Sequence, residues 1–268
     1  MPDTSERQRQ YLDAMGIEVW VPRDAAPGQV ENPVAEPVAA SPPASAGGEA
    51  TAPMPAAEAD PPTPVATGGS DVASPIHRLD WTALAARVAN CTRCELHRTR
   101  THTVFGVGNP DADWMIVGEA PGAEEDRQGE PFVGRAGKLL NNMLRAVGLQ
   151  RDEVYIANIL KCRPPGNRDP EPAEMEACTP YLNRQIQLVN PRLILAVGRI
   201  AAHYLLKSSA SLASLRGQVH QYAATGTPVV VSYHPAYLLR SPAQKGKAWA
   251  DLKLARQLVA GSSKDTES

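Results

Sequence analysis

The chain of 268 residues is poor in several features that define whole classes of protein. It has no stretch near the roughly 20 unbroken apolar residues of a membrane-spanning helix. Its N-terminal MPDTSERQRQ lacks the charged start and apolar run of a secretory signal. We therefore expect a cytoplasmic protein. Only four cysteines are present, and in a cytoplasmic protein such a set more often binds metal or does chemistry than forms disulfides.

One segment, residues 25–77, has no lysine or arginine and carries six acidic residues. Twelve of the 25 prolines lie between Pro22 and Pro75. Large apolar side chains are too sparse here to offset the entropy of ordering the chain, so a disordered linker is predicted. The predicted organisation is a short interaction peptide (1–24), the linker (25–77), one larger domain (78–262) and a polar tail (263–268).

The larger domain is basic, although the whole chain is slightly acidic. Residues 78–262 hold 23 lysines and arginines against 16 acidic residues, a balance of +7 that the linker conceals. A positive domain suits a phosphate-bearing partner such as nucleic acid. A solvated basic surface has the same balance, so charge alone does not decide between the two.

Within this domain, apolar runs alternate with helical patterns. Buried strands are predicted at 114–119, 154–160, 192–198 and 228–235. Helices are predicted at 80–90, from Gly137, from Pro172 to about residue 189, from Ile200, and at 245–259. The alternation predicts a three-layer αβα fold with a central four-stranded, mostly parallel sheet. Ligands bind at the carboxyl ends of such strands, where GEAPG, Asn158 and His234 lie.

The four cysteines can form one ligand set. Cys91 and Cys94 make a C-x-x-C, whereas 15 residues separate Cys162 from Cys178. A zinc ribbon normally shows two close pairs, so the wide second pair is unusual. Zinc and a cubane iron–sulfur cluster both accept four thiolates, and unrelated buried thiols are the alternative. A structural clip that ties the first helix to the sheet is a simpler role than electron transfer.

Five motifs follow the C-x-x-C in a fixed order. They are GEAPGAEED (118–126), GEPFVGRAGKLL (129–140), NILKCRPPGNRDP (158–170), Cys178 and HPAYLLR (234–240). Together they resemble the family-four uracil-DNA glycosylases, bacterial and archaeal repair enzymes that carry a four-iron, four-sulfur (4Fe-4S) cluster. The resemblance spans about residues 84–260. It implies a monomeric, nucleoid-associated hydrolase acting on uracil in single- or double-stranded DNA, with all four cysteines as cluster ligands.

The resemblance also implies roles for single residues in a base pocket. Phe132 would stack on a uracil flipped out of the helix. Asn158 would accept from N3–H and donate to O4, and His234 would stabilise the departing uracil anion. Their alternatives are a core phenylalanine, a capping asparagine and a structural histidine. The remaining base-binding positions that the resemblance implies are Gly118, Ala120 and Pro121.

Several acidic residues are candidates for positioning the attacking water. In the best-known uracil glycosylases an aspartate does so, but Ala120 stands at the corresponding place. Glu119 and Glu125 are the candidates, with Asp126 a poorer one, although an acidic run is usually a solvated surface.

Arg135 and Lys138 lie where a helix starts, so its backbone amides and these cations are expected to bind a DNA phosphate.

Family-five enzymes lack a glutamate at the position of Glu119. A relative that traps DNA covalently has an additional basic, histidine-bearing loop, which DRQGEPFVGRAG lacks.

The N-terminal peptide, residues 6–23, suggests a partner. YLDAMGIEVWVPR resembles the peptide of the clamp-loader psi subunit that binds the chi subunit of the bacterial polymerase III clamp loader. A helix that packs back on the catalytic domain is the alternative.

Two functions follow: a repair glycosylase that leaves an abasic site, or a replisome adaptor with a glycosylase-like fold and little activity. The intact set Glu119, Phe132, Asn158 and His234 favours the enzyme.

Overall fold

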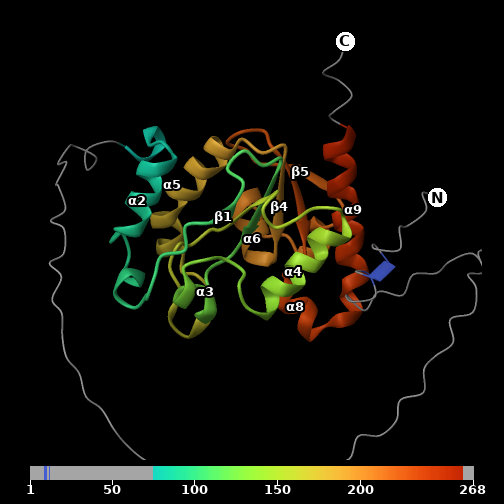
Figure 1. Ribbon diagram of the computed structural model, residues 1–268, viewed down its shortest axis with the longest axis horizontal. Coiled ribbons are helices and arrows are strands. Elements are labelled where there is room, and N and C mark those ends of the chain that lie inside the picture. Colours follow the sequence, from blue (N-terminus) through green and yellow to red (C-terminus); the bar gives the residue numbers. More distant parts are fainter. Residues whose placement is uncertain (1–8, 11, 13–74, 262–268) are drawn as a thin grey trace, which may run out of the picture. The chain divides into compact units, whose positions relative to one another are not determined.

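The structure is a computed structural model that describes residues 9, 10, 12 and 75–261 (Figure 1). Within these residues no helix is long and apolar enough to cross a membrane. Residues 25–74 of the predicted linker, nearly all of the predicted N-terminal peptide and the whole predicted tail lie outside the described residues, so the division of the chain stays a prediction. The last three residues of the predicted linker are described, and Ile76 and His77 belong to a 3-10 turn in which Ile76 is buried. Leu12 is described, and it is only 3% exposed.

The described residues form a six-stranded sheet in the order β1-β3-β2-β4-β6-β5. Four parallel strands make its centre: β2 (Trp114–Gly118), β3 (Tyr155–Asn158), β4 (Leu193–Val197) and β6 (Pro228–Ser232). They confirm the mostly parallel sheet. The predicted count of four is two short, because β1 (Val107–Gly108) and β5 (Val219–Gln221) add antiparallel edges. Each edge strand is too short to leave an apolar run in the sequence.

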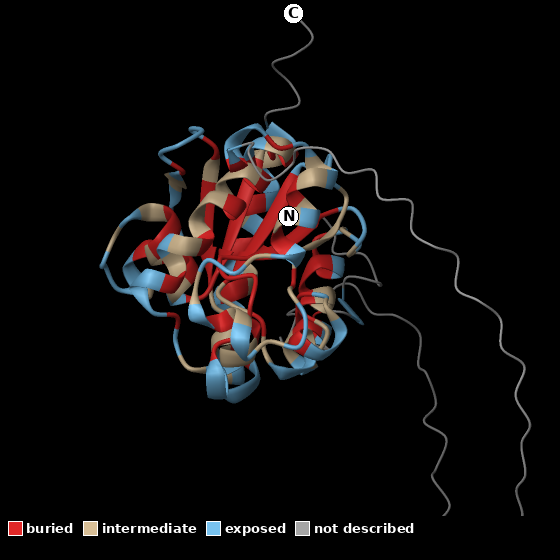
Figure 2. Cartoon of the chain, turned by 90° about the vertical axis from the view of Figure 1, so that its left-hand side faces the viewer, coloured by how far each residue is buried: buried red, intermediate tan, exposed pale blue. Residues whose placement is uncertain are grey.

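Helices cover both faces of the sheet, which confirms the three-layer fold. Met115 and Val117 of β2 face one cluster, which contains buried residues of α2 (Trp81–Ala89), α5 (Pro172–Val189) and α6 (Arg199–Leu206). Trp114 and Ile116 face the other, with α4 (Arg135–Ala146), α8 (Pro235–Arg240) and α9 (Lys245–Gly261). Figure 2 shows the strands as a buried layer between partly exposed helices.

The longer helices begin where their capping residues predict. The Asp80 carboxylate accepts a hydrogen bond from the Ala83 amide at 2.8 Å and starts α2. A capping box of Glu171 and Glu174 starts α5. The shorter elements are α3 (Ala123–Gln128), α7 (Leu212–Leu215) and 3-10 turns at Ile76–Arg78, Glu95–Arg98, Pro165–Asn167 and Pro242–Gln244.

Pairing between β2 and β3 continues past the ends of both strands. The Ile159 amide donates to the Gly118 carbonyl at 3.0 Å, and the Leu160 amide donates to the Glu119 carbonyl at 3.1 Å. The register places Gly118 opposite Asn158. The GEAPG loop and the Asn158 strand end are therefore fixed side by side at the carboxyl edge of the sheet.

Candidate active site

Four of the predicted site residues come together at this edge. A Cβ atom built on Gly118 would lie 2.4 Å from Asn158 Oδ1 and 2.7 Å from Cζ of the Phe132 ring. The Phe132 and His234 rings have centroids 5.6 Å apart and planes inclined at 31°. An amide, a phenyl ring and an imidazole therefore lie next to one another, and any side chain at position 118 would collide with Asn158 and Phe132.

Asn158 is the most informative of these residues. Its side chain is buried at 2% exposure, yet Oδ1 has no hydrogen-bond partner among the described residues. A buried carbonyl oxygen without a donor is costly, and nearly all such atoms in native proteins are paired. The Oδ1 atom of Asn158 therefore remains available as an acceptor beside Gly118 and the Phe132 ring.

Phe132 is held in an unusual backbone conformation. Its φ of 53° lies in the left-handed region, which a bulky residue adopts only when its surroundings impose it. Gly137 permits this, since a Cβ there would lie 1.7 Å from the Phe132 carbonyl oxygen. The Arg151 guanidinium donates to the carbonyl oxygens of Pro131 at 2.5 Å and Phe132 at 3.4 Å. Both supports were missed from the sequence; a glycine in the first turn of a helix was the available signal for Gly137.

His234 is a neutral imidazole at neutral pH. Burial, with the nearby Arg240 charge, lowers its pKa to about 4, and Glu125 only partly opposes this. Nδ1 accepts a hydrogen bond from the Ala236 amide at 3.1 Å as His234 caps α8. The single ring proton therefore belongs on Nε2, so His234 presents an N–H donor.

The pKa of Glu119 is shifted in the opposite direction to that of His234. Burial, with the nearby Asp169 carboxylate, raises its pKa to about 7, although Arg199 opposes the shift. Asp169 is itself paired with Arg199 at 2.9 Å. A half-buried carboxyl group that titrates near neutrality is suited to take a proton from water.

The other two acidic candidates hold loops in place. Glu125 Oε1 accepts from the amides of Val133 at 3.0 Å and Gly134 at 3.3 Å, and so fixes the turn that carries Phe132. Asp126 is buried and accepts from the Thr101 amide at 2.9 Å.

Ala120 and Pro121 continue the chain directly beyond β2, and Pro121 is buried. Arg135 and Lys138 are exposed on the first turn of α4. The Glu125 carboxylate already accepts from the two backbone amides just before that helix.

The four cysteines line a single pocket, together with Arg100 and Lys161. Cys162 and Cys178 are buried, whereas Cys91 and Cys94 are partly exposed. Arg100 joins the two halves, because its guanidinium donates to the Cys91 carbonyl at 2.7 Å and to Cys162 Sγ at 3.2 Å. As placed in the described part of the chain, no three histidine, cysteine, aspartate or glutamate side chains form a group that could hold a metal ion.

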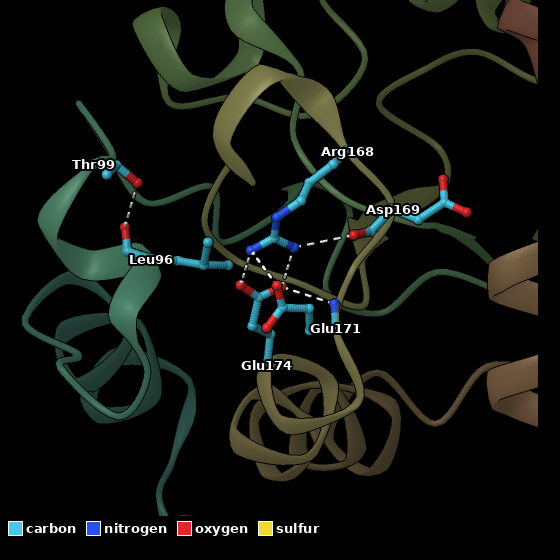
Figure 3. A network of polar contacts seen from close by, with 6 residues as sticks. All are labelled: Leu96, Thr99, Arg168, Asp169, Glu171 and Glu174. Atoms are coloured by element: carbon cyan, nitrogen blue, oxygen red, sulfur yellow. Dashed lines mark hydrogen bonds and ion pairs between the residues drawn. The ribbon is translucent and has the colours of Figure 1, made fainter.

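The loop between Cys162 and Cys178 is fastened by Arg168 (Figure 3). Its guanidinium binds both carboxylate oxygens of Glu174 at 2.6 and 2.9 Å and donates to the Asp169 carbonyl at 3.1 Å. Glu174 belongs to α5, the helix that also carries Cys178. This contact therefore fixes the loop against the helix that supplies the fourth cysteine.

Comparison with known proteins agrees with this site. The model of the uracil DNA glycosylase superfamily matches residues 105–253. The chain is 42% identical over 181 residues to the type-4 uracil-DNA glycosylase of Archaeoglobus fulgidus, covering 65% of this chain and 91% of the relative. It is 45% identical over 159 residues to the type-4 enzyme of Thermotoga maritima, covering 59% and 82%. A type-5 uracil-DNA glycosylase of Pyrobaculum aerophilum is 31% identical over 185 residues, covering 57% and 80%.

Fold and site together define a member of the uracil DNA glycosylase superfamily. Within it the chain belongs to the type-4 family, whose members it matches at higher identity than the type-5 enzyme. This confirms the family that the motifs resemble, and it agrees with the argument from Glu119.

Proposed function

We propose that the protein is a DNA repair glycosylase that hydrolyses the N-glycosidic bond of uracil in DNA and leaves an abasic site. The observation that carries this proposal is the unpartnered, buried Oδ1 of Asn158 beside the Phe132 ring. The names of the type-4 relatives support the same substrate.

Recognition follows from the donors and acceptors of the base. Uracil flipped out of the duplex stacks on Phe132, which replaces part of the stacking that it loses. Asn158 Oδ1 accepts from N3–H, and the Asn158 amide nitrogen donates to O4. Cytosine presents an acceptor at N3 and a donor at the four-position, so it mismatches both contacts. Gly118 leaves the room that the ring needs.

Bond cleavage places negative charge on the departing uracil. The Nε2–H of His234 donates to uracil O2, where that charge accumulates, and such a preorganised donor stabilises the transition state. A neutral donor needs no proton uptake before each turnover. Glu119, with its pKa of about 7, binds the attacking water and takes its proton.

The cysteine pocket is proposed to hold a 4Fe-4S cluster. Its donor set is four thiols that line one pocket, with an arginine donating to one sulfur. Cys91, Cys94, Cys162 and Cys178 would hold the cluster as thiolates, which is the ligand type that such clusters take. When bound, the cluster supplies a rigid crosslink between the segment before the domain sheet, the Asn158 strand end and α5.

Two partners are proposed for the surface. Arg135 and Lys138 bind DNA phosphates beside the pocket, which positions the strand without reading its sequence. Residues 6–23 bind the chi subunit of the polymerase III clamp loader, on the strength of their resemblance to the psi peptide.

The test is excision itself. Purified protein is incubated with single- and double-stranded oligonucleotides that contain one uracil, and alkali then cleaves at abasic sites. We expect cleavage at uracil and none in matched oligonucleotides that contain cytosine or thymine. His234→Ala should retain DNA binding and lose most turnover. Intact protein that leaves uracil in place would reject the enzyme in favour of the replisome adaptor.

A further inference from the structure

Lys161 is a buried lysine that lies between the two sites. Its side chain is 1% exposed, and it lines the same pocket as the four cysteines. Its ammonium group donates to the backbone carbonyl of Asn158 at 2.8 Å and to Gln185 Oε1 at 2.6 Å. One side chain therefore contacts the residue that faces the base and borders the pocket of the cysteines.

The charge of Lys161 needs a counter-charge. Taking an ammonium group out of water is costly unless opposite charge lies nearby. Both hydrogen-bond acceptors of Lys161 are neutral groups, whereas Cys162 is the next residue along the chain. The Lys161 backbone amide also donates to Cys178 Sγ at 3.3 Å. Two thiolates that carry a cluster would supply the missing negative charge beside the ammonium.

The position of the ammonium is fixed from the far side as well. Gln185 of α5 donates from Nε2 to the hydroxyl of Tyr155 at 3.0 Å and to the Phe105 carbonyl at 2.9 Å. This orients the Gln185 carbonyl oxygen toward Lys161. Since α5 also carries Cys178, movement of that helix would be transmitted through Gln185 and Lys161 to the Asn158 peptide.

We propose that Lys161 is a positioning residue that couples the cysteine site to the base-reading strand end. Its N–H donors hold the Asn158 carbonyl, and its charge offsets that of the thiolate-bound cluster. This inference rests on the proposed function for the first role and on the proposed cluster for the second.

The experiment separates the donor from the charge. Lys161→Met removes both, whereas Lys161→Gln removes the charge and keeps an N–H donor. Tyr155→Phe is the matched control, since it deletes one of the two hydrogen bonds that Gln185 Nε2 donates, leaves the other to the Phe105 carbonyl, and keeps both acceptors of Lys161 in place. Three quantities are measured on each full-length holoprotein: the single-turnover excision rate, the Kd for uracil-containing DNA, and the rate at which visible cluster absorbance decays under an iron chelator.

For Lys161→Met we expect an excision rate about 10- to 100-fold lower than that of the unaltered protein, because a charge-assisted hydrogen bond to the Asn158 carbonyl is lost. The Kd for uracil-containing DNA should stay within about twofold. Cluster absorbance should decay at least about fivefold faster, because charge and hydrogen bonding near the sulfurs tune such clusters. Lys161→Gln should recover most of the excision rate but keep the fast decay. Tyr155→Phe should resemble the unaltered protein in all three.

Several outcomes overturn the proposal. Lys161→Met with unchanged rate and unchanged decay rejects both roles. Equal losses in Tyr155→Phe would show a general weakening of the core instead. If neither Lys161 variant folds while Tyr155→Phe does, Lys161 is simply structural. If the unaltered protein excises no uracil, the proposed function fails, and the decay rates still decide whether Lys161 acts on the cluster.

Discussion

Burial acts in opposite directions on the two titratable side chains of the site. It lowers the pKa of His234 to about 4 and raises that of Glu119 to about 7, because burial always disfavours the charged form. The imidazole is thereby a neutral donor, and the carboxyl group is poised to lose its proton near neutral pH. The same physical cause thus gives both groups the protonation behaviour that the proposed function requires of a leaving-group donor and a base.

The pH dependence of excision tests this division. The raised pKa keeps Glu119 protonated below pH 7, so the single-turnover rate should rise with pH and level off above a midpoint near 7. His234 stays neutral from about pH 5 upward and adds no further step in this range. Glu119→Gln should lower the rate and remove the midpoint. A midpoint that persists near 7 in this variant would show that another group acts as the base.

Asn158→Asp tests base recognition. A carboxylate can still accept from N3–H of uracil, but it cannot donate to O4, and it places a negative charge beside the departing anion. We expect the single-turnover rate to fall about 100-fold or more. Asn90→Asp, at the exposed end of α2, is the matched control and should leave the rate unchanged. Retention of full activity in Asn158→Asp would remove Asn158 from the recognition role.

At this scale the sequence pointed to the residues that the structure brings together at the strand ends, but not to the residues that support them. Asn158 and His234 stand in motifs at strand ends, where a polar group has few other uses. Arg151 carries no such signal: it is an ordinary charged residue whose contact with the turn of Phe132 spans about 20 positions. Long-range support of this kind depends on how the elements pack, which no local pattern records.

Among the elements, the loop from Cys162 to Cys178 depends most on one contact. The Glu174 carboxylate is 7% exposed and binds Arg168 through both oxygens, whereas Glu171 is 62% exposed beside the same arginine. The Arg168 hydrogen bond lowers the pKa of Glu174. The stabilisation is therefore present above the unfolded pKa of the glutamate and is lost as pH falls through its lower folded value.

Glu174→Gln should lower the Tm by about 2–4 °C near pH 7, as expected for the loss of one such contact in a domain of this size. The difference from the unaltered protein should shrink as the pH falls through the lowered pKa of Glu174, where Glu174 itself becomes protonated. Thermal unfolding at a series of pH values measures this, with Glu171→Gln as the control that should change little. A Tm difference that is constant down to pH 3 would assign the loss to packing and not to charge.

The elements themselves were predictable to the extent that they are long. The four parallel strands are buried on both faces and leave continuous apolar runs, and α5 begins at Pro172 as its capping residues indicate. The two edge strands and the six-residue α8 were missed. These elements have too few residues to show any periodicity in the sequence. The two edge strands are extended because they pair with β3 and β6.

Across the whole molecule, the sheet separates two groups of features. Cys162 and Cys178 belong to the core cluster that includes α2 and α5. Leu12 belongs to the other, which includes α4 and α9. The buried Leu12 supports the interpretation in which the N-terminal peptide packs on its own domain, whereas the psi-like sequence supports a partner. The two interpretations compete for the same apolar side chain.

Deleting residues 1–24 decides whether this segment is needed for a partner or for the fold. Every residue of the proposed base pocket lies between 118 and 234, so excision should be unchanged. Capture of purified chi subunit should be abolished, and the Tm should fall by a few degrees because the burial of Leu12 is lost. Leu12→Ala in the full chain is the matched variant. If packing and partner compete, it should lower the Tm without preventing capture. Equal capture of chi by the full and shortened chains would refute the partner, and an unchanged Tm in both variants would refute the packing.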